Sequence, residues 1–141
     1  MVAAATVLLH PRVYGFRMAR ILLLDDDDVV RLVTAELLAE LGHIITPAAT
    51  CEVALDVLSA VHIDLLVTDI RMPGEMNGWD MAEAARLIRE ELPIVYMSGF
   101  SPYPIRTVAG AAYLHKPFTL SELREAVEVA INGIGMARGT A

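Results

Sequence analysis

Five side chains with complementary chemistry stand at or just after the ends of apolar runs in the sequence. Asp25 and Asp26 follow one run, and Asp69 follows another. Ser98 closes a third run, and Lys116 stands just beyond a fourth. Three carboxylates held together repel one another, and a hard divalent cation with oxygen ligands, such as Mg²⁺, would relieve that repulsion. A carboxylate beside the cation can attack phosphorus, while an ammonium and a hydroxyl can bind the oxygens of the transferred group.

The elements that must position these side chains follow from the pattern of apolar residues. Short continuous apolar runs bounded by polar residues fit strands that are buried on both faces. The stretches between them repeat apolar residues at helical spacing. We therefore predict strands over 20–24, 43–47, 63–68, 94–97 and 111–114, and helices over 28–41, 51–60, 78–91 and 119–131.

The alternation of strands and helices predicts an α/β fold, a doubly wound parallel sheet with helices on both faces. In such sheets, ligands bind where the carboxyl ends of the strands meet. We therefore expect the three aspartates, the serine and the lysine to converge at one edge of the sheet. Gly42 and Pro93 end two of the predicted helices, and the Gly-rich segment 133–141 is expected to be a loose tail.

Length, charge and cysteine content limit the classes of protein. The chain has 141 residues, which suits one domain, and its net charge is -7. Because the net charge is negative and no cluster of lysines and arginines is present, we expect no nucleic-acid partner; Lys116 is the only lysine. Cys51 is the only cysteine, which precludes an intramolecular disulfide and fits a cytoplasmic location.

The N-terminal segment 1–18 is interpreted as an extension outside the folded unit. It is apolar but has no basic region before its apolar run, so it does not resemble a secretory signal. No apolar run in the chain is long enough for a membrane span, and we expect no membrane partner. Met18 lies two residues before the first predicted strand and is an alternative start of the natural chain.

Four motifs, in order, resemble those of receiver domains in two-component signalling. They lie within residues 20–131 and each closes a predicted strand. The resemblance implies a response regulator with a flavodoxin-like, CheY-like sheet in the order 2-1-3-4-5, and a receiver unit over 19–132. The motifs are Ile-Leu-Leu-Leu-Asp-Asp (21–26), Val-Thr-Asp-Ile-Arg-Met-Pro-Gly (67–74), Met-Ser-Gly (97–99) and His-Lys-Pro-Phe (115–118).

The resemblance assigns the acidic residues to Mg²⁺ binding and phosphorylation. Asp69 matches the phosphoacceptor and, with Asp26, a metal ligand. Asp25 matches the acidic neighbour that usually acts on the metal through water. Arg71 stands where the family supplies a backbone carbonyl to the metal. We therefore expect Mg²⁺ as the cofactor.

The same resemblance assigns the remaining residues to phosphate binding and switching. Lys116 matches the phosphate-binding lysine, and Ser98 matches the switch hydroxyl that turns toward the phosphoryl group. Tyr113 matches the switch aromatic, which rotates between exposed and buried positions; a buried core tyrosine is the alternative interpretation. Pro117 matches the proline that follows a cis peptide bond in this family.

Two segments depart from the family pattern. The segment between Ser98 and Lys116 is short and contains Pro102 and Pro104, so we predict a shortened or irregular fourth helix. The loop at 74–77 is longer than usual, which bears on contact with the kinase and on access of water.

These observations predict a receiver that a histidine kinase or phosphotransfer protein phosphorylates on Asp69. We also expect a downstream protein partner, which the sequence does not identify. A homodimer is possible. It would not be an enzyme beyond slow self-catalysed phosphorylation and dephosphorylation. A receiver from a hybrid histidine kinase and a phosphorylation-independent interaction module are the alternatives. Two other classes of protein are excluded by single residues. A haloacid-dehalogenase phosphatase needs a second aspartate two residues after the nucleophile, where this chain has Arg71. An EF-hand calcium loop needs glycine at the position that Val30 occupies.

Overall fold

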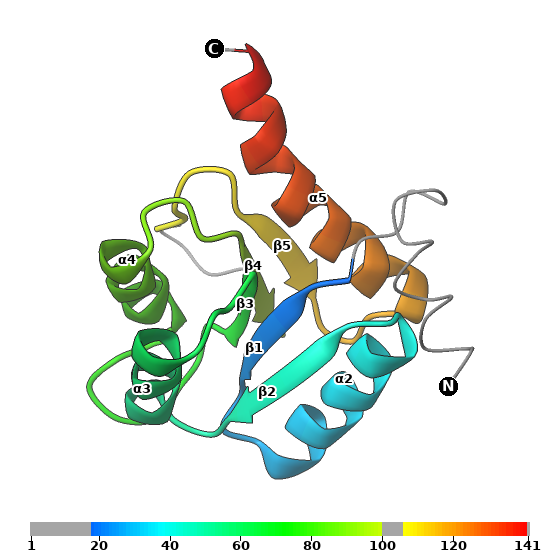
Figure 1. The fold of residues 1–141 in the computed structure, drawn as a ribbon. Helices are drawn as coiled ribbons and strands as arrows, with labels where there is room; N and C mark the ends of the chain where they lie inside the picture. Colours follow the sequence, from blue (N-terminus) through cyan, green and yellow to red (C-terminus); the bar gives the residue numbers. More distant parts are fainter. Residues whose placement is uncertain (1–17, 100–105, 141) are drawn as a thin grey trace.

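The computed structural model describes residues 18–99 and 106–140, with side chains described as far as residue 133. A five-stranded parallel sheet forms its centre, in the order β2-β1-β3-β4-β5 (Figure 1). The strands are β1 (Arg20–Leu24), β2 (Ile44–Ala48), β3 (Leu65–Asp69), β4 (Ile94–Ser98) and β5 (Ala112–His115). The helices are α2 (Asp28–Glu40), α3 (Cys51–Ala60), α4 (Gly78–Ile88) and α5 (Leu120–Thr140). The predicted fold class and strand order are confirmed.

The sheet is buried on both faces. Leu22 and Leu24 of β1 pack with residues of α3 and α4, while Ile21 and Leu23 pack with residues of α2 and α5. Successive side chains of a strand point to opposite faces, so a continuous apolar run fills both layers at once. Figure 1 shows the resulting three layers, with α3 and α4 on one face of the sheet and α2 and α5 on the other. This is the doubly wound arrangement that the sequence predicted.

Local signals set most of the helix bounds. The α3 helix has the predicted bounds, and its N-cap residue Thr50 accepts a hydrogen bond from the backbone N–H of Val53. Gly42 follows α2 with φ +96°, the left-handed conformation that ends helices. The α4 helix ends at Ile88 rather than at Glu91 as predicted, because Arg89 leaves the helical conformation and its side chain donates to the backbone carbonyl of Ile63.

The last helix is longer than predicted. We expected it to end at Ile131 and a loose tail to occupy 133–141, but α5 continues to Thr140. The predicted helix end at Ile131 was wrong, because the prediction gave the glycines more weight than the helix-forming residues beside them. A glycine costs a helix about 1 kcal/mol, and good helix formers such as Met136, Ala137 and Arg138 partly offset this cost. The division of the chain into extension, receiver unit and tail stays a prediction.

The segment between β4 and β5 is only partly described. Residues 100–105, which include Pro102 and Pro104, lie outside the described residues, so the predicted short helix is not tested there. Residues 106–111 contain no helix. Two ion pairs and two hydrogen bonds hold this part. Arg106 pairs with Asp80 and Glu83 of α4. The Arg86 guanidinium donates to the Ala109 carbonyl at 2.8 Å, and the Val108 N–H donates to the Tyr96 hydroxyl at 3.1 Å.

Among the residues that the structure describes, no helix has both the length and the apolar character needed to cross a membrane.

Candidate functional site

Three carboxylates meet at the carboxyl edge of the sheet, as the strand ends predicted. Asp25 and Asp26 directly follow β1, and Asp69 is the last residue of β3. One carboxylate oxygen from each residue lies within 4.8 Å of the other two. Asp25 is fully buried, Asp69 is partly buried and Asp26 is exposed, so the group opens to solvent on the side of Asp26.

Asp25 is held in place from several directions. Its backbone N–H donates to the carbonyl of Ala48 at 3.2 Å, which ties the end of β1 to the end of β2. Its carboxylate accepts the backbone N–H of Asp27 at 2.9 Å, and its backbone carbonyl accepts the guanidinium of Arg31 at 2.8 Å. A buried carboxylate with partners of this kind has a fixed orientation, which suits a residue that positions a cation or its waters.

Lys116 reaches two of the three carboxylates. Its Nζ lies 3.1 Å from the Asp25 carboxylate and 3.3 Å from the Asp69 carboxylate. Burial alone would lower the pKa of Lys116, but the hydrogen bond and charge of Asp25, with those of Asp69, raise the pKa above its ordinary value. Lys116 is therefore firmly protonated and supplies one fixed positive charge at the site.

Asp69 has the opposite electrostatic balance. Burial and the charge of Asp25 raise its pKa above the ordinary carboxyl value, although Lys116 and a backbone hydrogen bond from Arg71 act to lower the pKa. The salt bridge to Lys116 is thus not enough to offset the loss of hydration. The ionised form of Asp69 is disfavoured in this environment until more positive charge arrives.

The donor set fits a divalent cation. When all three are ionised, the carboxylates carry three negative charges against the one positive charge of Lys116, which leaves an excess of negative charge in a half-buried space. Oxygen donors with a solvent-open side suit Mg²⁺, which keeps several waters and binds through a few carboxylates. Asp25, Asp26 and Asp69 could therefore hold Mg²⁺. The part assigned to the Arg71 carbonyl stays a prediction.

Ser98 and Pro117 lie beside the acidic group. Ser98 is buried at the end of β4, where Asp69 pairs with the preceding residue, Met97, and the Ser98 carbonyl accepts the backbone N–H of Lys116 at 2.8 Å. This bond joins the ends of β4 and β5 at the site. The Lys116–Pro117 peptide bond is cis, as predicted.

The loop after Asp69 forms one wall of an open pocket of about 460 Å³ next to the carboxylates. Its lining mixes charged, polar and apolar side chains, so the pocket gives a polar molecule a route to Asp26 and the neighbouring carboxylates. The lining residues are Asp26, Ile70, Arg71, Met72, Pro73, Asn77 and Trp79.

Gly78 is a structural requirement of this loop that we did not single out from the sequence. Its N–H donates to the Ile70 carbonyl at 2.7 Å, so the start of α4 folds back onto the end of β3. A Cβ atom at residue 78 would lie 2.2 Å from the backbone oxygen of Asp69. The Asn77-Gly78 pair was visible in the sequence, but only the folded loop shows why the second residue must lack a side chain.

Tyr113 belongs to an aromatic group that runs from the site toward the surface. Its ring centroid lies 5.9 Å from that of Trp79 and 5.6 Å from that of Tyr96, and the rings of Trp79 and Tyr96 lie 4.7 Å apart. Tyr96 is fully buried, whereas Tyr113 is 41% exposed. The structure therefore places Tyr113 as a half-exposed ring against two buried ones, and its part as a switch stays a prediction.

Comparison with known proteins places these residues in a family context. The sequence model of the response regulator receiver domain matches residues 21–128. The DNA-binding transcriptional regulator NtrC of Azospirillum brasilense is 37% identical over 81% of this chain and 24% of its own length. The chain spans less than two thirds of the length of the first curated relatives that it matches.

Solved structures of similar proteins share the fold. A response regulator receiver protein from Sinorhizobium medicae has a TM-score of 0.77 and 34% identity, covering 84% of this chain and 98% of that chain. The response regulator TrrA from Thermotoga maritima, solved in complex with Mg(2+)-BeF, has a TM-score of 0.73 and 33% identity, covering 79% of this chain and 97% of that chain.

Proposed function

This chain belongs to the response regulator receiver family of two-component systems, and from that premise we propose that Asp69 is its phosphoacceptor. Phosphorylation of an aspartate is characteristic of the family. One observation carries the assignment to Asp69: the Asp69 carboxylate lies at the open carboxyl edge of the sheet, 3.3 Å from Lys116 and within 4.8 Å of two further carboxylates.

The phosphodonor is a histidine kinase or phosphotransfer protein, or a small acyl phosphate in its place. A carboxylate oxygen of Asp69 forms a bond to the phosphorus, and the bond between phosphorus and the donor breaks, with the electron pair leaving on the donor. The Lys116 ammonium binds an oxygen of the transferred group, and the Ser98 hydroxyl turns toward another. Bound Mg²⁺ would neutralise charge on the phosphoryl oxygens, and Asp25, Asp26 and Asp69 would hold it.

The conformational signal would pass from Ser98 along β4 and β5. The Ser98 carbonyl accepts the Lys116 N–H, and Tyr113 stands three residues before that lysine against the rings of Trp79 and Tyr96. A shift of Ser98 toward the phosphoryl group would therefore alter the packing of Tyr113. Such a local electrostatic event biases a two-state element that a downstream protein can recognise.

This receiver would act in the cytoplasm as a phosphoacceptor, with at most slow self-catalysed steps. The described residues resemble stand-alone receivers and receivers within longer proteins equally, so a receiver of a hybrid histidine kinase remains within the proposal. Mechanism and site residues are the same in both settings.

The test is intact-mass spectrometry after incubation with acetyl phosphate, with and without Mg²⁺. We expect an adduct of about 80 Da on the unaltered chain only when Mg²⁺ is present. Asp69→Ala should abolish the adduct, and Asp56→Ala, which removes an exposed carboxylate on α3, should not. No adduct on the unaltered chain would contradict the proposal and favour an interaction module that works without phosphorylation.

A further inference from the structure

The first turn of α4 is packed directly on the backbone of Asp69. The Gly78 N–H donates to the Ile70 carbonyl at 2.7 Å, and a Cβ atom at residue 78 would lie 2.2 Å from the Asp69 backbone oxygen. Groups in such close contact do not move independently of each other. A displacement of Asp69 therefore moves the start of α4 with it.

Asp80 connects this turn to a distant part of the chain. In the capping box of α4, Oδ2 of Asp80 accepts the backbone N–H of Asn77 at 2.9 Å, and the Asp80 N–H donates to Oδ1 of Asn77 at 3.0 Å. The other carboxylate oxygen of Asp80, Oδ1, accepts a hydrogen bond from Nη2 of Arg106 at 2.9 Å. The Asn77 N–H and, after it, Arg106 lower the pKa of Asp80, so the carboxylate is charged at neutral pH and holds both partners.

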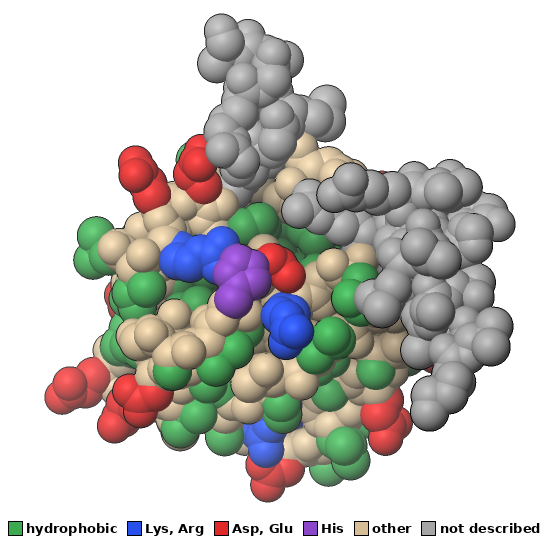
Figure 2. Space-filling view, in the orientation of Figure 1, with side chains coloured by type: hydrophobic (Ala, Val, Ile, Leu, Met, Phe, Trp, Pro, Cys, Tyr) green, Lys and Arg blue, Asp and Glu red, His purple; other side chains and the backbone are tan. Residues whose placement is uncertain are grey.

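Arg106 bridges two carboxylates on one side of α4. Its Nη2 atom also donates to Oε1 of Glu83 at 2.7 Å. Asp80 and Glu83 stand at positions i and i+3 of the helix, so they would repel each other without a cation between them. The surroundings are acidic as well, since the chain has a net charge of -7 and Figure 2 shows acidic side chains along the margin of one face. We therefore expect Arg106 to follow the first turn of α4 when that turn moves.

Residues 106–111 lie beside α4 and are fixed at two further points (Figure 1). The Arg86 guanidinium, in the last turn of α4, donates to the Ala109 carbonyl at 2.8 Å. The Val108 N–H donates to the hydroxyl of Tyr96 in β4 at 3.1 Å. A movement of the first turn of α4 relative to these two anchors therefore changes the conformation of the segment, and most of its residues are exposed.

We propose that Asp80 is a positioning residue that transmits the state of the phosphorylation site to residues 106–111 through Arg106. The inference rests on the proposed function, because the phosphoryl group supplies the displacement of Asp69. The first turn of α4 would move with Asp69 and carry Arg106, while the two other anchors hold the rest of the segment. A downstream protein then has a second surface, besides Tyr113, at which it can recognise the phosphorylated state.

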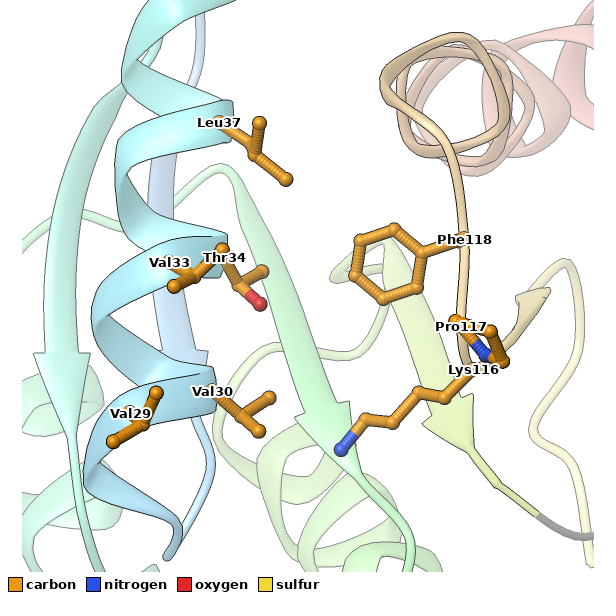
Figure 3. A pocket seen from close by; sticks show the side chains of 8 residues that line it. All are labelled: Val29, Val30, Val33, Thr34, Leu37, Lys116, Pro117 and Phe118. Atoms are coloured by element: carbon orange, nitrogen blue, oxygen red, sulfur yellow. The ribbon is translucent and has the colours of Figure 1, made fainter.

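A second direction out of the site provides an internal control. Lys116, 3.3 Å from Asp69, also lines an apolar groove of about 410 Å³ between α2 and Phe118, and in Figure 3 its ammonium points toward Val30. The α2 helix packs on the opposite face of the sheet from α4. A change at Asp80 should therefore leave any response of α2 to phosphorylation unaltered.

Hydrogen–deuterium exchange of the full chain, with Mg²⁺ and with or without excess acetyl phosphate, tests the proposal. We expect phosphorylation to change the exchange rates of the amides of residues 106–111 by at least about threefold in the unaltered chain. In Asp80→Asn, the side-chain oxygen can still accept the Asn77 N–H but the charge is lost, so the change should fall below about 1.5-fold. Intact mass, measured on the same samples, gives the phosphorylated fraction at which the variants are compared.

Glu83→Gln is the matched control, because it removes the other carboxylate partner of Arg106, which takes no part in the capping box. The response of about threefold should persist in this variant. Arg106→Gln breaks the link to Asp80 from the other side and should abolish the response as Asp80→Asn does. A merely structural role of Asp80 would instead speed exchange equally with and without acetyl phosphate and leave the ratio of the two rates unchanged.

The possible outcomes separate this inference from the proposed function. A phosphoryl adduct without any change at residues 106–111 would overturn the inference and leave the proposed function standing, whereas the absence of an adduct would overturn both. A response that persists in Asp80→Asn, or that is lost to the same extent in Glu83→Gln, would also overturn the inference. Loss of the response at residues 106–111 alone in Asp80→Asn, with α2 unchanged, would support it.

Discussion

At the scale of the residue, Asp69 is held in an environment that disfavours its charge. Burial and the carboxylate of Asp25 raise its pKa, so the folded state binds the proton more tightly than the unfolded state does. The stabilising contribution of such a group is fully present below its ordinary pKa and is lost as the pH rises through the raised value. At neutral pH, without a cation, the ionised Asp69 therefore reduces the stability of the fold.

Asp69→Asn should consequently stabilise the protein at pH 7 without Mg²⁺, by about 1 kcal/mol, the usual size of a point-mutant effect. The advantage should shrink as the pH falls through the raised pKa of Asp69, because Asp69 itself then becomes neutral. Urea unfolding across this pH range measures the difference. Asp56→Asn, on the exposed side of α3, should show no such dependence. A less stable Asp69→Asn at neutral pH would contradict this electrostatic account.

At the scale of the element, the start of α4 is packed against the end of β3 with no space for a side chain. Gly78→Ala would put a Cβ atom 2.2 Å from the Asp69 backbone oxygen and 2.6 Å from Cα of Ile70. The backbone must then move, and we expect a loss of about 2–4 kcal/mol, which outweighs the gain of about 1 kcal/mol that alanine brings to a helix. Chemical denaturation measures the loss.

Gly99→Ala is the comparison for that variant, because nothing lies within 4 Å of a Cβ atom at residue 99. It should change stability by less than about 1 kcal/mol. Equal losses for the two alanine variants would mean that glycine is needed for chain flexibility rather than for close packing. Gly78→Ala should also slow phosphorylation, since the displaced backbone carries Asp69.

Two arginines, Arg86 and Arg106, connect α4 to the segment before β5, and their contributions to the stability of the fold should differ. Arg86 donates to the backbone carbonyls of Leu92 at 2.7 Å and Ala109 at 2.8 Å from a partly buried position. Its replacement by alanine should cost about 2–3 kcal/mol, because charge-assisted bonds are lost and carbonyls are left unpaired. Arg106→Ala removes a 41% exposed arginine with two carboxylate partners, and because solvent screens such pairs it should cost less stability than Arg86→Ala.

Thermal unfolding of the two variants side by side provides the measurement. If Arg106→Ala were the more damaging, the exposed ion pairs rather than the carbonyl contacts would hold residues 106–111 in place.

The sequence was most informative where a single strand or helix carries its own signal. Apolar runs predicted all five strands, and the polar residues that end them predicted which side chains meet at the edge of the sheet. Gly78, Arg86 and Arg106 were missed because their partners lie in other elements: the last two contact residues 23 to 26 positions away. No periodicity reports such tertiary contacts. The length of α5 was missed because local glycine costs do not decide where a helix ends.

At the scale of the whole molecule, cation binding and folding should be coupled. A cation that binds only the folded chain stabilises it by mass action, by about 2.7 kcal/mol at a concentration one hundred times the dissociation constant. We therefore expect Mg²⁺ to raise the melting temperature and a chelator to reverse the effect. Asp26→Asn, at an exposed carboxylate of the site, should weaken the response. Glu36→Gln, at an exposed position of α2, should leave it intact. An equal response in both variants would place the cation elsewhere.

The aromatic group near the site also gives the protein an internal optical probe. Trp79 is the only tryptophan, it is buried, and it lines the pocket that contains Asp26. Tyr96 and Tyr113 lie close enough to pass excitation energy to it. A change in emission on addition of Mg²⁺ or acetyl phosphate would therefore follow the occupancy of the site in real time, without an attached dye, and Tyr113→Phe would show how much of that change comes from the half-exposed ring.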